Sequence, residues 1–368
     1  MQHWILQNKM QIIFIKTESV HSKFLPDKGK TGMIENILLS EEEFNNSSSN
    51  SYLDRIQTLF RHQLKNWELA KTGYESLNSV QVREFHFDDF VIKAQFNPGR
   101  IISSAAKVDE KSIRERKCFL CYNNLPEHQK AITFENNFLI LVNPYPIFPV
   151  HFTIPMLDHL PQLIEDNLQA MLSLTKAIGE NYTVFYNGPK CGASAPDHMH
   201  FQAGLKNFMP IDWEYEIIKD KKCKILFEDD ETKILGCTNY LRKFFAIQSS
   251  SKAKTLKVFS KLYTSIQKTQ RAYEIEPMMN IISRFEDGEY FVFVFPRSKH
   301  RPDYYFSEGD KKIILSPASV DLGGVCITPR QEDFEKITKE IIEDIFRQVS
   351  VGEEEFEFFS KSLTELIN

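Results

Sequence analysis

The chain of 368 residues has only six cysteines and no apolar run long enough to cross a membrane. Two cysteines form a Cys-x-x-Cys pair, and the other four are scattered, so no disulfide framework is indicated. The short apolar run at residues 12–15 lacks the length and the cleavage site of a signal peptide. These absences exclude a disulfide scaffold and a membrane span, and they predict a cytoplasmic protein.

The usual nucleotide-binding signatures are missing too. There is no Walker loop, no Gly-x-Gly-x-x-Gly and no kinase signature. The formal net charge of −5 disfavours a general nucleic-acid binder. The 42% of hydrophobic residues can still build a large core, as one large domain or two.

The most informative segment is residues 192–202, where a small loop precedes His-x-His-x-Gln. Alternation along a strand would place His198, His200 and Gln202 on one face. The loop offers backbone N–H groups, from Gly192 and Ala193 onward, and the Ser194 hydroxyl, all suited to a phosphate oxygen. A phosphate cradle facing a neutral imidazole is the arrangement for attack on phosphorus, so the segment predicts nucleotidyl transfer. A His-x-His pair alone is also typical of metal ligands or of ordinary sheet polarity.

The Cys-x-x-Cys pair, Cys118 and Cys121, has the spacing of a zinc knuckle. Two further ligands are needed, and His159 and His198 are the candidates, with His151 in reserve. The alternative is a thioredoxin-type redox pair, but the surrounding sequence does not look like a helix start in a βαβ unit. We therefore expect about one structural Zn²⁺.

These motifs together resemble the histidine-triad superfamily. The closer resemblance is to the branch with galactose-1-phosphate uridylyltransferase, the diadenosine tetraphosphate phosphorylases and GDP-galactose phosphorylase. Gly-Ala-Ser before the histidines resembles the dinucleotide phosphorylases, His-Met-His-Phe-Gln-Ala resembles the GDP-galactose phosphorylases, and the Cys pair resembles the zinc-bearing uridylyltransferases. Met199 stands where the uridylyltransferases carry Pro.

The resemblance implies a role for each matching residue. His200 would be the nucleophile that takes up the nucleoside monophosphate, and Gln202 would donate its amide to a phosphoryl oxygen. His198 would support the strand through its carbonyl and bind zinc where zinc is present. Ser194 and Asn187 would contact phosphate.

The predicted fold is α+β, with two histidine-triad-like halves of antiparallel sheet and packed helices. Residues 1–50 are expected to be an N-terminal extension and linker, 51–225 the catalytic half, and 226–368 a second, degenerate half without its own His-x-His-x-Gln. Residues 295–302 echo residues 154–161 as strand, Pro, three residues, His, one residue, Pro. Three cations follow that strand, and they suit either a phosphate group or a solvated loop: Arg297, Lys299 and Arg301.

The sequence thus predicts a nucleotidyltransferase or phosphorylase that acts on a nucleotide sugar or a dinucleoside polyphosphate through a nucleotidyl-histidine. Its partners would be the nucleotide and a phosphate or sugar-phosphate acceptor, without nucleic acid or membrane, and a homodimer stays open. Two alternatives remain, a histidine-triad-type nucleotide hydrolase and a zinc-stabilised nucleotide-binding protein without turnover.

Overall fold

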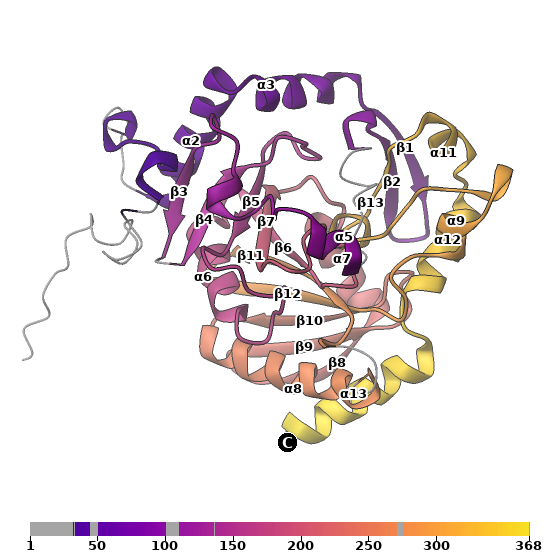
Figure 1. Ribbon diagram of the computed structural model, residues 1–368. Helices are drawn as coiled ribbons and strands as arrows, with labels where there is room; N and C mark the ends of the chain where they lie inside the picture. Colours follow the sequence, from indigo (N-terminus) through magenta and orange to yellow (C-terminus); the bar gives the residue numbers. More distant parts are fainter. Residues whose placement is uncertain are drawn as a thin grey trace, which may run out of the picture.

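The computed structural model describes residues 32, 34–44, 51–100, 110–135, 137–270 and 275–367. The expected linker at residues 45–50, and most of the expected N-terminal extension, lie outside these ranges. The described chain is α+β, as predicted, and its centre is one ten-stranded sheet (Figure 1).

The first half of the large sheet consists of five strands and the helix between β5 and β6. Their bounds are β3 (Ala131–Phe134), β4 (Phe138–Val142), β5 (His151–Pro155), α6 (Leu168–Ile178), β6 (Tyr182–Asn187) and β7 (His200–Leu205).

The second half repeats this order of elements. It consists of β8 (Cys223–Glu228), β9 (Thr232–Cys237), β10 (Phe244–Ser249), α8 (Lys252–Gln270), β11 (Met279–Glu286) and β12 (Glu289–Pro296).

The order of the sheet, β3-β4-β5-β7-β6-β11-β12-β10-β9-β8, is symmetrical about its middle. Each half has an outer hairpin, a third strand, a helical crossover and an inner pair of strands. The inner strands β6 and β11 pair antiparallel, with Asn187 opposite Asn280. The two halves are therefore related by an approximate two-fold axis, and corresponding loops lie at opposite ends of the sheet.

Both faces of the large sheet are covered. One face packs its apolar side chains against α2 (Tyr52–Asn66), α6, α8 and α13 (Glu353–Ile367). The other face packs against α7 (Ile211–Lys222), α12 (Lys339–Val349) and a small sheet. This small sheet has the order β1-β2-β13, from β1 (Gln81–His86), β2 (Val91–Phe96) and β13 (Val325–Thr328).

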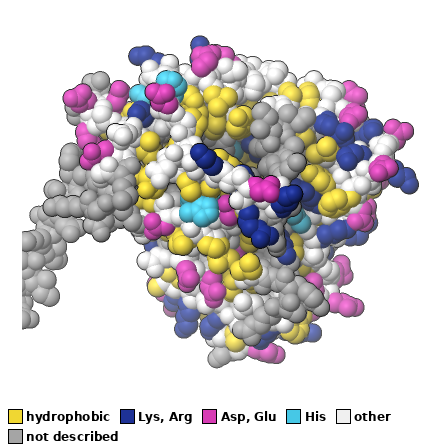
Figure 2. Space-filling model, viewed as in Figure 1, with side chains coloured by type: hydrophobic (Ala, Val, Ile, Leu, Met, Phe, Trp, Pro, Cys, Tyr) yellow, Lys and Arg dark blue, Asp and Glu magenta, His cyan; other side chains and the backbone are white. Residues whose placement is uncertain are grey.

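The remaining helices are short. They are α3 (Glu68–Glu75), α5 (Glu110–Glu115), α9 (Asp303–Phe306), α10 (Ser319–Leu322) and α11 (Gln331–Lys336). Figure 2 shows basic side chains gathered over α5 and beside the small sheet, with acidic groups between them. No helix in the described ranges combines the length and the apolar character needed to cross a bilayer.

Several local expectations hold. Ser51 and Asp54 resemble a capping box and predict a helix after Ser51; α2 begins there, and the Ser51 hydroxyl accepts from the Asp54 N–H as an N-cap. The apolar run 138–142 predicts a strand, which is β4, and Asp287-Gly288 predicts a hairpin turn, which joins β11 to β12.

Two helix predictions were wrong. The apolar spacing of Leu160, Ile164, Leu168 and Met171 predicts a helix from Leu160, but α6 begins only at Leu168, because Gln162 turns its side chain to the backbone of the sheet. The N-cap pattern at Thr328 predicts a single helix through Ile345, but the segment forms two helices, and Thr338 caps the second one. Thr328 itself ends β13.

The cysteines taken as scattered include one pair. Cys223 and Cys237 face each other in the β8–β9 register and form a disulfide. The two cysteines are 14 positions apart in the sequence, so their spacing alone does not indicate that they pair.

Candidate active site

A cavity of about 470 Å³ lies against the large sheet at β5, β6 and β7. Both halves of the chain line it. Among the lining residues are seven that the sequence singled out: Asn187, Gly192, Ala193, Ser194, His200, Gln202 and Arg301. An apolar part of the wall comes from the first half, with Leu125, Leu141, Val142, Ile147 and Phe185.

His200 begins β7 and is 3% exposed. Its Nδ1 lies 2.8 Å from the His198 carbonyl oxygen, which can only accept, so Nδ1 carries the proton and donates. Burial lowers the pKa of His200 to about 4, against the smaller opposing effect of this hydrogen bond. The ring is therefore neutral near pH 7, with its lone pair on Nε2.

The backbone of His200 is held by Gln162, a residue for which no role was predicted from the sequence. The Gln162 side chain accepts from the His200 N–H at 2.7 Å and donates to the His200 carbonyl at 2.9 Å. It also donates to the carbonyl of Asn187 at 3.0 Å. Gln162 is fully buried and thus ties the start of β7 to the end of β6.

Gln202 lies two residues further along β7, on the same cavity face as His200. Its Oε1 is 3.0 Å from Nε2 of His151. His151 is completely buried, and burial lowers its pKa to about 3, so it is neutral.

Asn187 ends β6 and is held by residues of the second half. Its Oδ1 accepts from the Asn280 amide at 2.9 Å and from the Ser319 backbone N–H at 2.8 Å. With two donors on the oxygen, the amide group of Asn187 is left to face the cavity.

The loop from Gly192 to Ser194 packs against the segment that precedes α10. Gly192 has φ +96°, and a Cβ there would lie 2.5 Å from the Cβ of Ala318. Only glycine fits both the backbone angle and the space. The Ser194 hydroxyl, with no hydrogen-bond partner among the described residues, lines the cavity.

The three cations predicted after β12 separate into different environments. Arg297 is fully buried outside the cavity wall and donates to Asn280 Oδ1 and to backbone carbonyls, including that of Pro317. Lys299 forms an ion pair with Asp303. Arg301 lines the cavity, donates to the Ser316 hydroxyl at 3.1 Å and stacks on Tyr305.

Further charged or titratable groups line the cavity. Arg100, which follows β2, donates to the Tyr145 carbonyl at 2.6 Å. His300 is kept neutral because burial, and then the charge of Arg301, lower its pKa to about 4. Asp321 accepts from two backbone N–H groups, and burial raises its pKa to about 6.

The four predicted metal ligands come together beside the cavity. One ligand atom from each of Cys118, Cys121, His159 and His198 lies within 4.8 Å of the others. The Nδ1 of His198 is 3.3 Å from the Cys118 sulfur, and the Nδ1 of His159 is 3.2 Å from the Cys121 sulfur. Two thiolates and two imidazoles are a donor set that fits tetrahedral Zn²⁺.

Groups around the cluster orient the ligands. The Nε2 of His198 donates to the Met156 carbonyl at 2.7 Å, which leaves its Nδ1 as an acceptor toward the cysteines. Asp197 approaches His159 at 3.6 Å and forms an ion pair with Arg116. His151 does not belong to the cluster.

One expectation about the motif needs correction. His198 lies before β7 rather than within it, so its ring turns to the cysteines while His200 and Gln202 face the cavity. His198 serves both places, since its carbonyl accepts from His200 and its ring belongs to the cluster.

The sequence missed the residues that orient others. Gln162 and Asn280 read as ordinary members of a helix and a strand, and their roles depend on distant backbone groups. Arg100 belongs to none of the motifs from which the site was predicted.

Comparisons with known proteins agree with this architecture. Residues 217–368 match the family described as GDPGP1-like, C-terminal domain, and residues 59–205 match a domain of unknown function, DUF4922. No curated protein matches the chain significantly.

The structure resembles yeast Ap4A phosphorylase Apa2. For the complex with Ap4A the TM-score is 0.54 at 16% identity, covering 82% of this chain and 98% of that chain. For the complex with AMP the TM-score is 0.53 at 15% identity, covering 82% and 97%. At this level of identity the likeness shows a shared fold, and the match to the GDPGP1-like family is confined to residues 217–368.

Proposed function

We propose that this protein is a nucleotide phosphorylase that works through a covalent nucleotidyl-His200 intermediate. The observation that carries the proposal is the buried, neutral imidazole of His200, with Nδ1–H donated to the His198 carbonyl and Nε2 left for attack. The substrate would be a nucleotide sugar or a dinucleoside polyphosphate, which the resemblance of the sequence motifs implies and the fold shared with yeast Ap4A phosphorylase supports.

In the first step, Nε2 of His200 would attack the α-phosphorus. The N–P bond forms, the P–O bond to the leaving phosphate breaks, and the leaving oxygen takes the electron pair. The imidazole keeps its Nδ1 proton and becomes positively charged, and the His198 carbonyl stabilises this charge.

In the second step, an oxygen of phosphate or of a sugar phosphate attacks the same phosphorus. The P–N bond breaks and its electron pair returns to Nε2. The burial that lowers the pKa of His200 also disfavours the cationic ring, which makes the imidazole a better leaving group.

The remaining chemistry is positioning and charge stabilisation. The amides of Asn187 and Gln202, the Ser194 hydroxyl and the loop N–H groups would hold the phosphoryl oxygens. Arg301 and Arg100 would add positive charge at the cavity.

The test is covalent labelling. Wild-type protein is incubated with an α-labelled nucleotide sugar or Ap4A without acceptor, and the label should be acid-labile, base-stable and located on His200. His128→Ala, a change of an exposed histidine, is the matched control and should label normally. A label on another residue would disprove the mechanism. Formation of a nucleoside diphosphate only with phosphate present supports the phosphorylase, whereas phosphate-independent nucleoside monophosphate supports the alternative hydrolase.

We also propose that Cys118, Cys121, His159 and His198 hold one structural Zn²⁺. The ion would fix His198, whose carbonyl orients His200, and would take no part in bond cleavage. Metal analysis of protein purified without chelator should give about one zinc per chain. Cys121→Ser should lower that content and the melting temperature together, while Cys326→Ser, at a buried free cysteine outside the cluster, should keep the zinc.

A further inference from the structure

The amide of Gln202 has a defined orientation because of the tautomer of His151. The Nδ1 of His151 faces the backbone N–H of Ile147 at 3.3 Å, so Nδ1 accepts. Since the ring is neutral, its proton lies on Nε2, which donates to Gln202 Oε1 at 3.0 Å. The NH₂ group of Gln202 is then the part that faces the cavity.

Turning this amide around would set two donors against each other in a buried place. The NH₂ group would face the N–H of His151, and both groups would lose a hydrogen bond. The oxygen of Gln202 would then point at the phosphoryl oxygens. His151 therefore determines that Gln202 presents its NH₂ donor, and not its oxygen, at the cavity surface.

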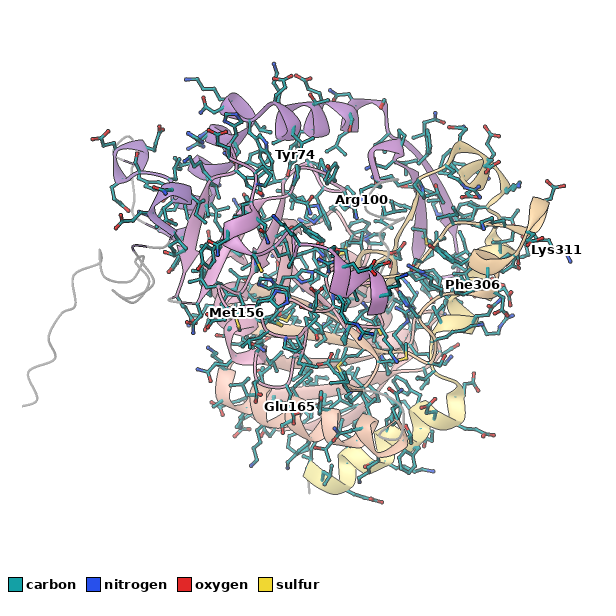
Figure 3. The ribbon with its side chains drawn as sticks, in the orientation of Figure 1. Tyr74, Arg100, Met156, Glu165, Phe306 and Lys311 are labelled. Atoms are coloured by element: carbon teal, nitrogen blue, oxygen red, sulfur yellow. A yellow bond between two sulfur atoms is a disulfide. The ribbon has the colours of Figure 1, made fainter. Side chains whose placement is uncertain are left out.

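His151 itself is held firmly. The Tyr74 hydroxyl donates to its carbonyl at 2.9 Å and accepts from its N–H at 3.1 Å. Tyr74 comes from α3 and is labelled in Figure 3. The His151 ring packs edge-on to Phe148, with ring centres 5.2 Å apart.

The glycine opposite His151 makes this packing possible. Gly204 pairs with His151 in the β5–β7 register. A Cβ at Gly204 would lie 2.3 Å from Cδ1 of Phe148, so the Phe148 ring occupies the space that a side chain there would need. The backbone and the ring of His151 are therefore held by Tyr74 and Phe148, neither of which lines the cavity.

We infer that His151 is a positioning residue, which orients Gln202 so that its amide N–H₂ donates to the phosphoryl group at His200. This inference rests on the proposed function. His151 is not itself a nucleophile, because both of its ring nitrogens are engaged.

A double-mutant cycle tests the inference. Gln202→Ala should lower kcat by about 30- to 1,000-fold, the value of one aligned donor. His151→Leu should lower kcat about 10-fold with a smaller change in KM, and His151→Gln, which keeps a donor, should recover most of it. In the Gln202→Ala background, His151→Leu should change kcat less than about 2-fold.

A purely structural role would give a different pattern. His151→Leu would then cost the same factor with and without Gln202, which would overturn the inference. Thr175→Val removes a buried hydrogen bond on α6 and is the control for general destabilisation, so its kcat should be normal.

A second variant works even if changes at His151 impair folding. Gln202→Glu would accept from His151 with one carboxylate oxygen and present the other to the phosphate. Its kcat should therefore fall below that of Gln202→Ala. A Gln202→Glu protein more active than Gln202→Ala would mean that the oxygen of residue 202 faces the cavity, and it would refute the inference. A normal kcat for Gln202→Ala would instead count against the phosphoryl contact in the proposed function, a result separate from the labelling of His200.

Discussion

The connection between the two inner strands differs between the two halves. In the first half, residues 188–199 separate β6 from β7 and supply the loop at Gly192–Ser194 and one candidate zinc ligand, His198. In the second half, only Asp287 and Gly288 separate β11 from β12. The candidate site therefore depends on one long connection, which the corresponding tight turn cannot replace.

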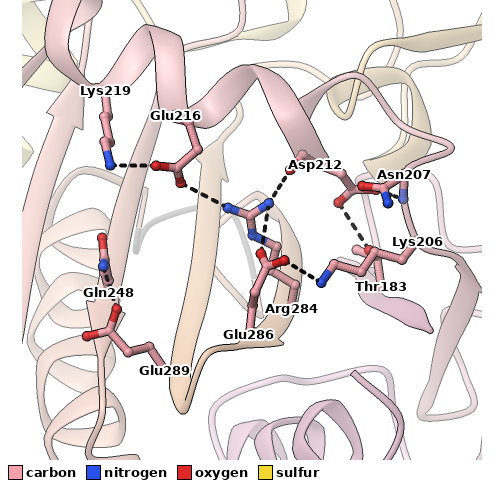
Figure 4. A network of polar contacts seen from close by, with 10 residues as sticks. All are labelled: Thr183, Lys206, Asn207, Asp212, Glu216, Lys219, Gln248, Arg284, Glu286 and Glu289. Carbon is pink, nitrogen blue, oxygen red and sulfur yellow. Dashed lines mark hydrogen bonds and ion pairs between the residues drawn. The ribbon is translucent and has the colours of Figure 1, made fainter. Parts of the chain in front are cut away.

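The end of the sheet where a second site would lie is filled by a polar network (Figure 4). Arg284 of β11 is 2% exposed and donates to the Asp212 carbonyl on α7. Asp212 accepts from Thr183, and Lys206 pairs with Glu286. These contacts hold α7 against this end of the sheet.

The second half contributes to the first half's site instead. Its chain beyond β12 brings Arg301, Ala318 and Asp321 to the cavity, and Asn280 of β11 orients Asn187. Of the two related halves, one provides the proposed nucleophile, His200, and the other completes the cavity wall.

The largest expected effect is a loss of kcat without a loss of nucleotide affinity, on a change at His200 in the first half. His200→Ala deletes the attacking nitrogen and should reduce kcat by at least about 10³-fold while leaving the phosphate loop intact. Steady-state kinetics and nucleotide titration measure the two properties. Retained turnover would contradict the role of His200, and His86→Ala, at an exposed histidine of β1, is the control.

The glycines of the two connections should respond differently. Gly192→Ala meets Ala318 and a positive φ, so we expect a loss of about 2–4 kcal/mol in unfolding free energy and weaker nucleotide binding. Gly288 has φ +84° but open space, and Gly288→Ala should cost about 1 kcal/mol without affecting binding. Chemical denaturation and nucleotide titration check both, and equal effects on binding would contradict the contrast.

The polar network should matter for stability alone. Arg284→Met removes the buried donor to α7 and should lower the free energy of unfolding by about 2 kcal/mol. Its kcat and KM should match wild type under conditions where the protein is folded. A selective loss of kcat would show that this end of the sheet takes part in catalysis.

The smallest effect concerns a carboxyl that joins the halves. Glu276 accepts from the Ile164 N–H and the Tyr186 hydroxyl, and burial raises its pKa to about 7. The folded state keeps this proton up to about pH 7 and the unfolded chain loses it near 4.5, so unfolding free energy falls as pH rises between them. Glu276→Gln should therefore be about 1–2 kcal/mol more stable than wild type at pH 8 and similar at pH 5. Thermal denaturation at both values decides it, and a difference independent of pH would contradict the shift.

The site residues that belong to local sequence patterns could be predicted from the sequence. The alternation around His200 and Gln202, the Cys-x-x-Cys spacing and the glycine-led loop led to residues that the fold brings together. The orienting partners escaped it, because a Gln in a helix-like segment or a His on a strand shows nothing of the distant carbonyl or amide that it binds. Gln162, Asn280 and His151 acquire their roles only from long-range packing.

The repeated octapeptide shows the limit of local similarity. Pro155 ends β5, whereas Pro296 ends β12, and β12 corresponds to β7. The two octapeptides therefore occupy different places in their halves. The order of the strands, rather than this echo, reveals the internal repeat.

The pairing of β6 with β11 also means that neither half is complete as a separate polypeptide. Cutting the chain at the exposed Asn207 would turn both inner strands into bare edges, with Tyr186 and Ile281 uncovered. The two fragments would carry complementary hydrogen-bonding edges and matching apolar surfaces. Such a nicked protein would suit a split reporter, because its activity would return only when the two fragments associate.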